Sequence, residues 1–405
     1  MPHHRQRYIQ TAIQHSLTAF PIVGIFGQRQ VGKTTITTSL SPDYVTLDLQ
    51  SNLAICDASP IAFLQNRQHP FAIDECQLSP ALFPALKESV RLLPKPGRFL
   101  ITGSVRFTSR KMIRESLTGR IALHELLPMN ITESHSEALN ELPIKTMEAL
   151  KSKAPEKLKA YLNRLVKHRK LPTWHKRIAD FLISGGLPGV CFSHNSDLRH
   201  KKWESYLETI LLRDLQLIIQ TTLSYASLRN LLVQIALRQG EGLELNELAR
   251  LTGISALTTK KILLALDGLF LIRELPTLGS TAKSAYYLED QGLAYHLVAG
   301  WKNTHFDLFR LLFANVRQQF TYRGDVRFLH YKTRGGAFLP LVCQTAKGMI
   351  AYTACEEGEP TVQTLRSAES FLKAYPQACV FIGHKGAEIR MWHSRLWSVP
   401  LGLLL

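Results

Sequence analysis

The sequence has few of the features that would place it in a membrane or outside the cell. No hydrophobic run reaches the roughly 18 residues of a membrane-spanning helix, and residues 1–5 lack the apolar stretch of a signal peptide. The six cysteines are scattered, with no C-x-x-C pair and no histidine at the spacing of a zinc site. We therefore expect a cytoplasmic protein with free thiols, and the cysteines indicate neither a disulfide framework nor a metal site.

Acidic residues are scarce relative to basic ones. The 49 lysines and arginines against 32 aspartates and glutamates give a net charge of +17, which attracts polyanions such as DNA. Residues 151–177 contain ten lysines and arginines and a single acid, Glu156. This stretch is either a solvated helical face or a patch that contacts phosphates. Charge alone does not separate these two interpretations.

Residues 27–34 read GQRQVGKT and match the phosphate-loop pattern G-x-x-x-x-G-K-[ST] at every fixed position. They follow an apolar run, residues 22–26, that is typical of a buried strand. In such a loop, backbone N–H groups turn onto phosphate oxygens, and the next helix presents its positive N-terminus. We expect Lys33 to reach the outer phosphates of ATP and Thr34 to hold Mg²⁺. The residues expected to contact the nucleotide are Gly27, Arg29, Gln30, Val31, Gly32, Lys33, Thr34 and Thr35.

Further strand-like segments follow the loop, separated by helical stretches. They are residues 44–48, 71–75, 98–102 and 121–123. Strands that alternate with helices predict a parallel sheet with covered faces, whose ligands lie at the carboxyl ends of the strands. The predicted fold class is therefore α/β, with a phosphate loop at the edge of the sheet where ligands bind.

Two adjacent acids end the segment 71–75. We expect Asp74 to hold Mg²⁺ through its water shell together with Thr34, and Glu75 to polarise the attacking water. Ser104 follows the segment 98–102 and is expected to place a hydroxyl beside the γ-phosphate. The alternative for Ser104 is a polar strand exit without a catalytic role.

An arginine is expected to complete the site. Residues 109–118 have a helical pattern, and Arg120 directly precedes the next strand. From that location Arg120 can reach a phosphate in its own subunit or in a neighbouring one, where such a residue supplies about 10³–10⁵ in rate. Arg106 and Arg114 are the rival candidates.

These motifs together resemble the AAA+ ATPases of bacteria and archaea that carry a DUF4143 C-terminal region. The resemblance includes T-G-S at 102–104, E-L-x-P at 125–128, G-G-L-P at 185–188 and Y-L-E-T-I-L-L-R-D at 206–214, and it covers roughly residues 5–300. It implies ATP binding with slow hydrolysis at Lys33, Thr34, Asp74 and Glu75, and a helical lid after the sheet. The basic stretch from about 130 to 177 is longer than in that family, and we interpret it as an insertion.

The region after the lid has the pattern of a winged helix. Residues 245–252 and 256–269 predict two helices joined by a turn at Gly253, with Ser255 as N-cap and with Leu257, Leu263 and Leu266 facing inward. Residues 271–275 and 285–288 are the predicted wing strands. The second helix would present residues 258–261 (Thr258, Thr259, Lys260 and Lys261) to a DNA groove, or the module contacts a protein. For Arg213 and Asp214, which end the preceding helix, the alternatives are an intramolecular ion pair and a nucleotide-sensing role.

The last hundred residues suggest a nuclease-like fold without nuclease chemistry. Relatives often end in a restriction-endonuclease-like domain, but the corresponding strands at 337–342 and 349–355 carry no acid for a metal. The predicted domains are an ATPase core at 1–130, the insertion and lid at 131–225, the winged helix at 226–300 and a degenerate nuclease-like domain at 301–405. We expect a slow, Mg²⁺-dependent ATPase whose nucleotide state controls the C-terminal contacts. The alternative is a DNA-binding regulator or signalling switch that holds ATP with little turnover, and a homo-oligomer or a protein partner is also consistent with the sequence.

Overall fold

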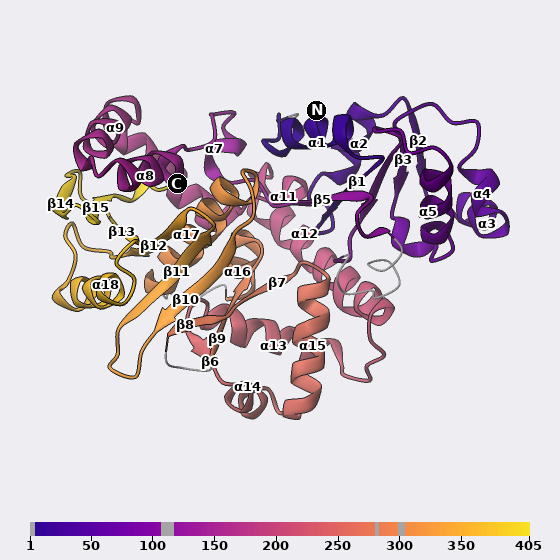
Figure 1. Ribbon diagram of the computed structural model, residues 1–405. Helices are drawn as coiled ribbons and strands as arrows, with labels where there is room; N and C mark the ends of the chain where they lie inside the picture. The colour runs from indigo at the N-terminus through magenta and orange to yellow at the C-terminus, as the bar shows by residue number, and fades with distance from the viewer. Residues whose placement is uncertain (1–4, 107–116, 280–282, 299–303) are drawn as a thin grey trace. The chain divides into compact units, whose positions relative to one another are not determined.

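The structure, a computed structural model, describes residues 5–106, 117–279, 283–298 and 304–405 (Figure 1). It divides into two compact units. The first unit comprises Met1–Pro128, Asp214–Gln220 and Leu263–Leu271, and the second comprises Met129–Arg213, Thr221–Ile262 and Ile272–Leu405. The helix predicted at 109–118 lies largely outside the described residues. Within the described residues, no helix combines the length and the apolar character needed to cross a membrane.

The first unit is built on a parallel sheet, as its alternating strands and helices predict. The strands are β1 (Ile22–Gly27), β2 (Asp43–Thr46), β3 (Phe71–Asp74), β4 (Phe99–Gly103) and β5 (Ile121–Leu126). Their order is β2-β3-β4-β1-β5, and every neighbouring pair is parallel. The parallel α/β prediction is therefore confirmed. Because the strands run the same way, β1, β3 and β4 all end at the same edge of the sheet.

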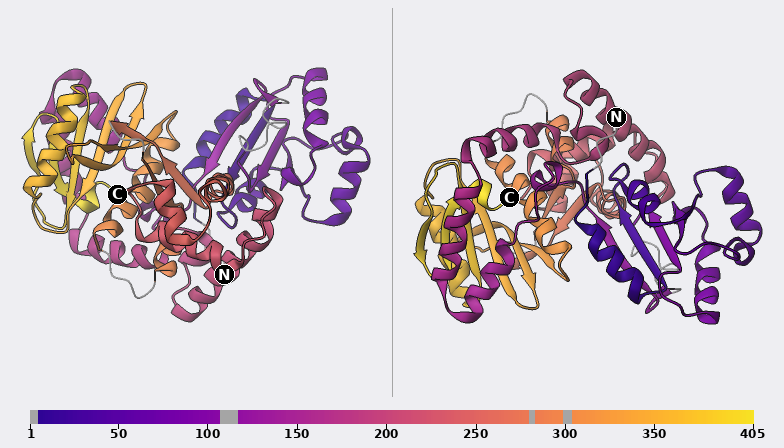
Figure 2. Two further views of the ribbon diagram at one scale, coloured as in Figure 1. Left: turned by 90° about the horizontal axis from the view of Figure 1, so that it is seen from below. Right: turned by 90° about the horizontal axis from the view of Figure 1, so that it is seen from above.

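Helices cover both faces of this sheet (Figures 1 and 2). The unit contains the helices α1 (Ile9–Ala19), α2 (Lys33–Leu40), α3 (Gln50–Ala58), α4 (Pro60–Phe63) and α5 (Leu82–Leu92), with the short 3-10 turns η1 (Cys76–Leu78) and η4 (Leu215–Leu217). Side chains alternate along β1: Ile22 and Phe26 join one hydrophobic cluster with Phe83 and Leu86 of α5. Burial on both faces explains why the central strands β1, β3 and β4 have largely apolar sequences.

The second unit begins with a series of helices. These are α7 (Ile131–Ser134), α8 (Leu142–Ser152), α9 (Pro155–His168), α10 (Leu171–Ser184), α11 (Pro188–Cys191) and α12 (Ser196–Glu208). A π-helical turn, η3 (Thr209–Asp214), continues from α12, and its last residue belongs to the first unit. Gly186 fits only as glycine, since a Cβ there would overlap the carbonyl oxygen of Met129. The G-G-L-P motif is therefore a close backbone contact within this unit.

A seven-stranded sheet forms the C-terminal half of the second unit. Its strands are β8 (Thr277–Gly279), β10 (Arg327–Lys332), β11 (Phe338–Thr345), β12 (Gly348–Ala354), β13 (Cys379–His384), β14 (Arg390–His393) and β15 (Leu396–Pro400). Their order is β14-β15-β13-β12-β11-β10-β8. The helices α17 (Thr304–Thr321) and α18 (Val362–Ala374) pack on this sheet, and the turn η5 (Leu401–Leu403) follows β15.

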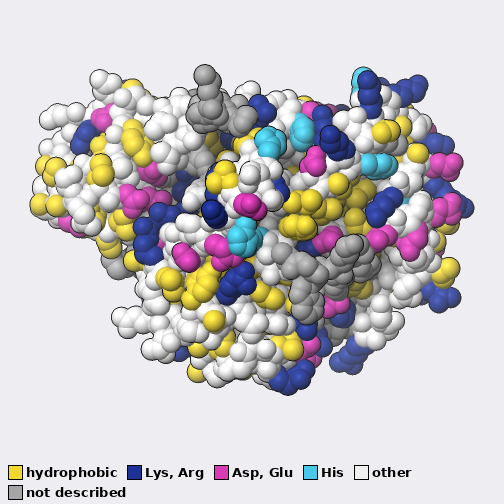
Figure 3. All heavy atoms as spheres, turned by 180° about the vertical axis from the view of Figure 1, so that it is seen from behind, with side chains coloured by type: hydrophobic (Ala, Val, Ile, Leu, Met, Phe, Trp, Pro, Cys, Tyr) yellow, Lys and Arg dark blue, Asp and Glu magenta, His cyan; other side chains and the backbone are white. Residues whose placement is uncertain are grey.

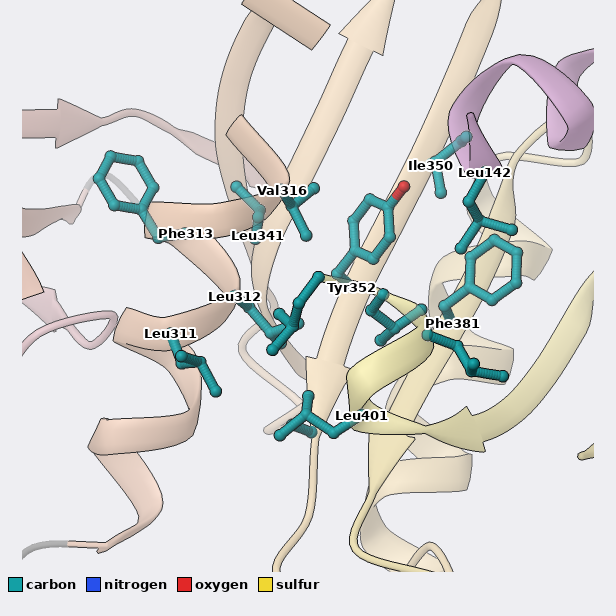
Figure 4. Close-up of a cluster of buried hydrophobic side chains, with 14 of the residues drawn as sticks. Leu142, Leu311, Leu312, Phe313, Val316, Leu341, Ile350, Tyr352, Phe381 and Leu401 are labelled. Carbon is teal, nitrogen blue, oxygen red and sulfur yellow. The ribbon is translucent and has the colours of Figure 1, made fainter. Parts of the chain in front are cut away.

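One hydrophobic core joins this sheet to the helices that precede it. Leu341, Tyr352 and Phe381 of the sheet belong to one buried cluster with Leu142 of α8 and Phe313 of α17 (Figure 4). The same cluster contains side chains from α9 and α10, namely Leu158, Leu162, Trp174, Ile178 and Phe181. This differs from the predicted boundary, which placed 131–225 and 301–405 in separate domains. The basic helices share their core with the C-terminal sheet.

A small sheet and three helices occupy the middle of the chain. They are α13 (Tyr225–Leu237), β6 (Gly242–Leu243), α14 (Leu245–Thr252), α15 (Ala256–Gly268), β7 (Ile272–Leu275) and β9 (Ser284–Leu288), followed by α16 (Gln291–Leu297). The strands pair in the antiparallel order β6-β9-β7. The helices and turn predicted here are present: Gly253 has φ +70°, and the hydroxyl of Ser255 accepts the N–H of Thr258 at 3.2 Å.

Two orientations predicted for α15 are wrong. Leu257 is 67% exposed and does not face inward, whereas Thr259 is fully buried and cannot reach a groove. The hydroxyl of Thr259 donates to the carbonyl oxygen of Ile254 at 3.4 Å. The first turn of α15 is therefore rotated relative to the predicted face, while Lys260 and Lys261 remain exposed.

Candidate nucleotide-binding site

The loop between β1 and α2 has the backbone of a phosphate cradle. Gln30 has φ 62° and Gly32 has φ 103°, so both residues have a left-handed backbone conformation just before α2 begins at Lys33. Gly27 is also constrained, since a Cβ there would overlap the carbonyl oxygen of Leu126. These conformations turn the loop toward the helix N-terminus, where free N–H groups and the helix dipole attract anions.

Lys33 lies inside this loop. Its ammonium donates to the carbonyl oxygens of Gly27 at 3.0 Å and Gln28 at 3.1 Å. The side chain is 5% exposed, and burial lowers its pKa, against the opposing effect of Glu75 and Asp74. Phosphate oxygens are stronger acceptors than carbonyl oxygens, so an incoming triphosphate can take over these hydrogen bonds.

Both oxygens of the Asp74 carboxylate accept hydrogen bonds. The hydroxyls of Thr34 and Tyr44 donate to Oδ2 at 2.7 and 2.8 Å. The hydroxyl of Thr102 and the backbone N–H of Glu75 donate to Oδ1, the latter at 3.1 Å. Burial, followed by this contact with Asp74, raises the pKa of Tyr44. The predicted pair Thr34 and Asp74 is thus brought into direct contact.

Glu75 is held by two neighbours at the same edge of the sheet. Its Oε2 accepts from the side-chain amide of Gln77 and from the hydroxyl of Ser104 at 3.1 Å. The amide of Gln77 also lies 3.2 Å from the Ser104 hydroxyl. Glu75 has φ 56°, a left-handed backbone that costs a non-glycine residue about 1–3 kcal/mol. Such strained conformations are found mainly at functional sites, because they persist only where the surrounding structure fixes them.

The oxygen atoms at this site are suitable ligands for Mg²⁺. Carboxylate and hydroxyl oxygens, as in Asp74 and Thr34, are the hard ligands that this ion takes in nucleotide sites. The site also has spare hydrogen-bonding capacity: the side-chain amide of Gln28 is 1% exposed, and neither of its polar atoms has a partner among the described residues. The constellation therefore fits a Mg²⁺-bound, phosphate-bearing ligand.

Three contributors to the site were missed from the sequence. Arg7, 4% exposed, donates to the carbonyl oxygens of Val31 at 2.7 Å and Leu127 at 2.5 Å and so fixes the loop from outside. Tyr44 and Thr102 come from the strands that flank β3. No local pattern signals any of them, since each acts on a residue distant in the sequence. The predicted Thr35 lies exposed on α2.

Arg29 of the loop forms an ion pair with Asp214. Its guanidinium lies 3.5 Å from the carboxylate, and the side chains are 22% and 5% exposed. Both residues belong to the first unit. Of the two alternatives expected for Asp214, the ion pair is therefore present, and it is made with the phosphate loop.

The arginines proposed as fingers have different positions. Arg120 directly precedes β5. The first residue of β5, Ile121, pairs with Ile22, the first residue of β1. The length of β1, about 16 Å, therefore separates this point from the phosphate loop. The expectation that Arg120 could serve its own subunit is therefore wrong, because it lies at the opposite edge of the sheet. Arg106 is engaged by Glu125 at 3.0 Å and Asp267 at 3.2 Å. Arg114 lies outside the described residues.

The basic stretch at 151–177 is partly structural. Arg169 is 8% exposed, donates to the carbonyl oxygen of Gly402, and lies over the ring of Trp174 at 4.3 Å. Arg177 pairs with Glu137. These two arginines therefore hold the fold together, whereas Lys167 and Lys170 are exposed. On the face drawn in Figure 3, basic side chains are interspersed with acidic ones.

Two family models match the chain. Residues 19–135 match the AAA domain model AAA_14, and residues 151–305 match a domain of unknown function, DUF8612. Two uncharacterized proteins, from Mycobacterium bovis and Mycobacterium tuberculosis, are 28% identical to the chain over 297 residues, which is 71% of this chain. The chain spans 58% of the length of these curated relatives. The expected DUF4143 region stays a prediction.

Two solved structures are also similar. A Walker-type ATPase of Pyrococcus abyssi is 14% identical with a TM-score of 0.44, over 73% of this chain and 98% of that one. A signal transduction ATPase (STAND) protein with a tetratricopeptide repeat sensor, from Pyrococcus horikoshii, is 15% identical with a TM-score of 0.24, over 79% of this chain and 46% of that one. The phosphate loop, the paired acids and the match over residues 19–135 together show that the N-terminal part of the chain contains an AAA domain of the P-loop ATPase type.

Proposed function

We propose that this protein binds ATP with Mg²⁺ and hydrolyses it slowly, and that its nucleotide state controls contacts made by the rest of the chain. The observation that carries this proposal is the direct contact between Thr34 and Asp74 beside the buried Lys33. A phosphate loop, a hydroxyl and a strand-end carboxylate in this arrangement serve nucleoside triphosphates.

Each residue has a distinct role in the proposed reaction. Thr34 and Asp74 would hold Mg²⁺, which supplies charge neutralisation across the β and γ phosphates. Lys33 would move from the loop carbonyl oxygens to the outer phosphates. Glu75 would orient the attacking water in line with the bond that breaks, and Ser104 would lie near the γ-phosphate.

Slow turnover follows from the position of Glu75. Its Oε2 accepts from Gln77 and Ser104, so two donors already occupy this carboxylate oxygen. For Oε2 of Glu75 to orient a water molecule, at least one of these hydrogen bonds would have to be released. An arginine from outside the subunit would complete the site, and Arg120 is the candidate if a neighbouring copy approaches the nucleotide.

The alternative function is a DNA-binding switch that holds ATP with little turnover. Its support is the element order α13–β6–α14–α15–β7–β8–β9, in which three helices accompany the three-stranded sheet β6-β9-β7, as expected for a winged helix. Lys260 and Lys261 are exposed on α15. The order α17–β10–β11–β12–α18–β13 supports the nuclease-like domain at 301–405 in the same way. Neither β11 nor β12 carries an acid, so we propose no nuclease activity.

Steady-state ATP hydrolysis, measured with and without duplex DNA at low salt, separates the two functions. A slow ATPase turns over ATP without DNA, and Glu75→Gln abolishes the signal. A switch binds ATP stoichiometrically and shows no turnover above the Glu75→Gln background. Failure to bind ATP would overturn both proposals.

A further inference from the structure

Three metal-ligating side chains converge in the second unit, away from the nucleotide site. His200 and Glu204 lie one helical turn apart on α12, and His296 comes from α16. Their ligand atoms all lie within 4.8 Å of one another. The Nε2 of His296 is 2.6 Å from Oε1 of Glu204, and the ring centroids of His200 and His296 are 4.8 Å apart. Residues four apart share a helix face, so both α12 ligands point to the same side.

The surroundings of the cluster favour ligation. His296 is 8% exposed and directs Nε2 toward the carboxylate of Glu204, so its ring nitrogen lies beside a second ligand atom. Glu204 is supported from α13 by Arg229 at 3.0 Å and the hydroxyl of Tyr225 at 3.3 Å. These two hydrogen bonds orient the carboxylate. His200 is exposed, so an ion can enter from solvent.

We propose that His200, Glu204 and His296 form a binding site for Zn²⁺. Two imidazoles and one carboxylate are a ligand set that zinc takes with a water in the fourth position, whereas Mg²⁺ prefers oxygen ligands alone. With bonds of about 2.0–2.2 Å, ligand atoms around zinc lie about 3.3 Å apart. The 2.6 Å contact would open and the wider separations would close by small side-chain movements.

Zinc at this position would tie α12 to α16. His296 now points its Nε2 at the carboxylate, so ligation through that atom places the ring proton on Nδ1. Arg229 would stay beside the carboxylate and share it with the ion. The spacing of these residues in the sequence does not indicate a metal site, because His296 lies 92 positions after Glu204. The proposal does not depend on the ATPase function.

The test is a Zn²⁺ titration of the full chain after chelator treatment and dialysis, followed by calorimetry, with Co²⁺ as a coloured substitute. We expect one strong site per chain, visible-region cobalt bands, and no competition from excess Mg²⁺. His200→Ala changes an exposed residue, so the fold survives, and it should weaken binding by at least about tenfold. His194→Ala, a nearby exposed histidine outside the cluster, is the matched control and should bind as the wild type does.

Two results would overturn the proposal. One is the absence of a strong zinc site in the wild-type chain, which would leave the cluster as a hydrogen-bonded network around Glu204. The other is equal zinc affinity in His200→Ala and His194→Ala, which would place the ion on other residues. Circular dichroism of both variants establishes that they are folded.

Discussion

The guanidinium of Arg29 lies 3.5 Å from the carboxylate of Asp214, so an acidic side chain far along the sequence contacts the phosphate loop. A carboxylate at this position has the same sign of charge as the phosphates that the loop is built to bind. It also lowers the positive potential near Lys33, on whose pKa Asp214 acts. Binding of a triphosphate therefore competes with Asp214 for Arg29.

Replacing Asp214 by asparagine should strengthen MgATP binding. The change keeps the shape of the side chain while releasing Arg29, and for a partly exposed pair we expect a gain of about two- to tenfold in affinity. A fluorescence or calorimetric titration measures it, with the exposed Asp197→Asn as control. Weaker binding in Asp214→Asn would show instead that Asp214 holds Arg29 in its productive position.

Replacing Glu75 by glutamine should separate binding from turnover. The amide keeps the size of the side chain but cannot take a proton from water, so turnover should fall by about 10² or more while ATP affinity is retained. Glu88→Gln, on the exposed side of α5, should leave both unchanged. Wild-type turnover in Glu75→Gln would remove the water-orienting role from Glu75.

His330 should make the second unit sensitive to acid. Burial lowers the pKa of His330 to about 4, while an unfolded histidine titrates near its ordinary value of about 6.5. As pH falls from about 6.5 to about 4, the unfolded chain takes up the proton first, so stability is lost by about 2–3 kcal/mol. The free energy of unfolding, measured by chemical denaturation across this pH range, should depend less steeply on pH in His330→Gln than in the exposed control His175→Gln. Equal slopes in the two variants would contradict the assignment.

The basic stretch should divide into structural and solvent-facing residues. Arg169→Ala removes the hydrogen bond to Gly402 and the contact with Trp174, so it should lower the melting temperature. Lys167→Glu with Lys170→Glu should leave the melting temperature unchanged. If this surface contacts DNA, the double variant also lowers the salt slope of DNA binding. A large stability loss in the lysine variant would show that these side chains are structural too.

Much of the nucleotide site could be predicted from the sequence because its signals are local. The phosphate loop, the strand before it and the acids at the end of β3 lie within short segments. Strands β1, β3 and β4 could be predicted within a few residues because burial on both faces makes their sequences largely apolar. Lys33, Thr34, Asp74 and Glu75 can therefore be named as candidate site residues without knowledge of the sheet order.

The rest depends on contacts between distant segments. Tyr44 and Thr102 reach Asp74 only because β2 and β4 flank β3, an order that no local pattern reveals. In the sequence, Arg169 is one of many basic residues. In the fold it is buried and donates to the carbonyl oxygen of Gly402, 233 positions later. Thr259 shows a different failure: the helix was predicted, but its rotation depends on what it packs against.

The central claim is that the loop around Lys33 binds the phosphates of ATP, and equilibrium titration of the chain with MgATP tests it most directly. Wild type should bind one nucleotide per chain, and Lys33→Ala should bind at least about 100-fold more weakly, since it removes the cation aimed at the outer phosphates. Lys87→Ala, an exposed lysine on α5, is the matched control and should bind as the wild type does. Equal ATP affinity in Lys33→Ala and Lys87→Ala would contradict the account.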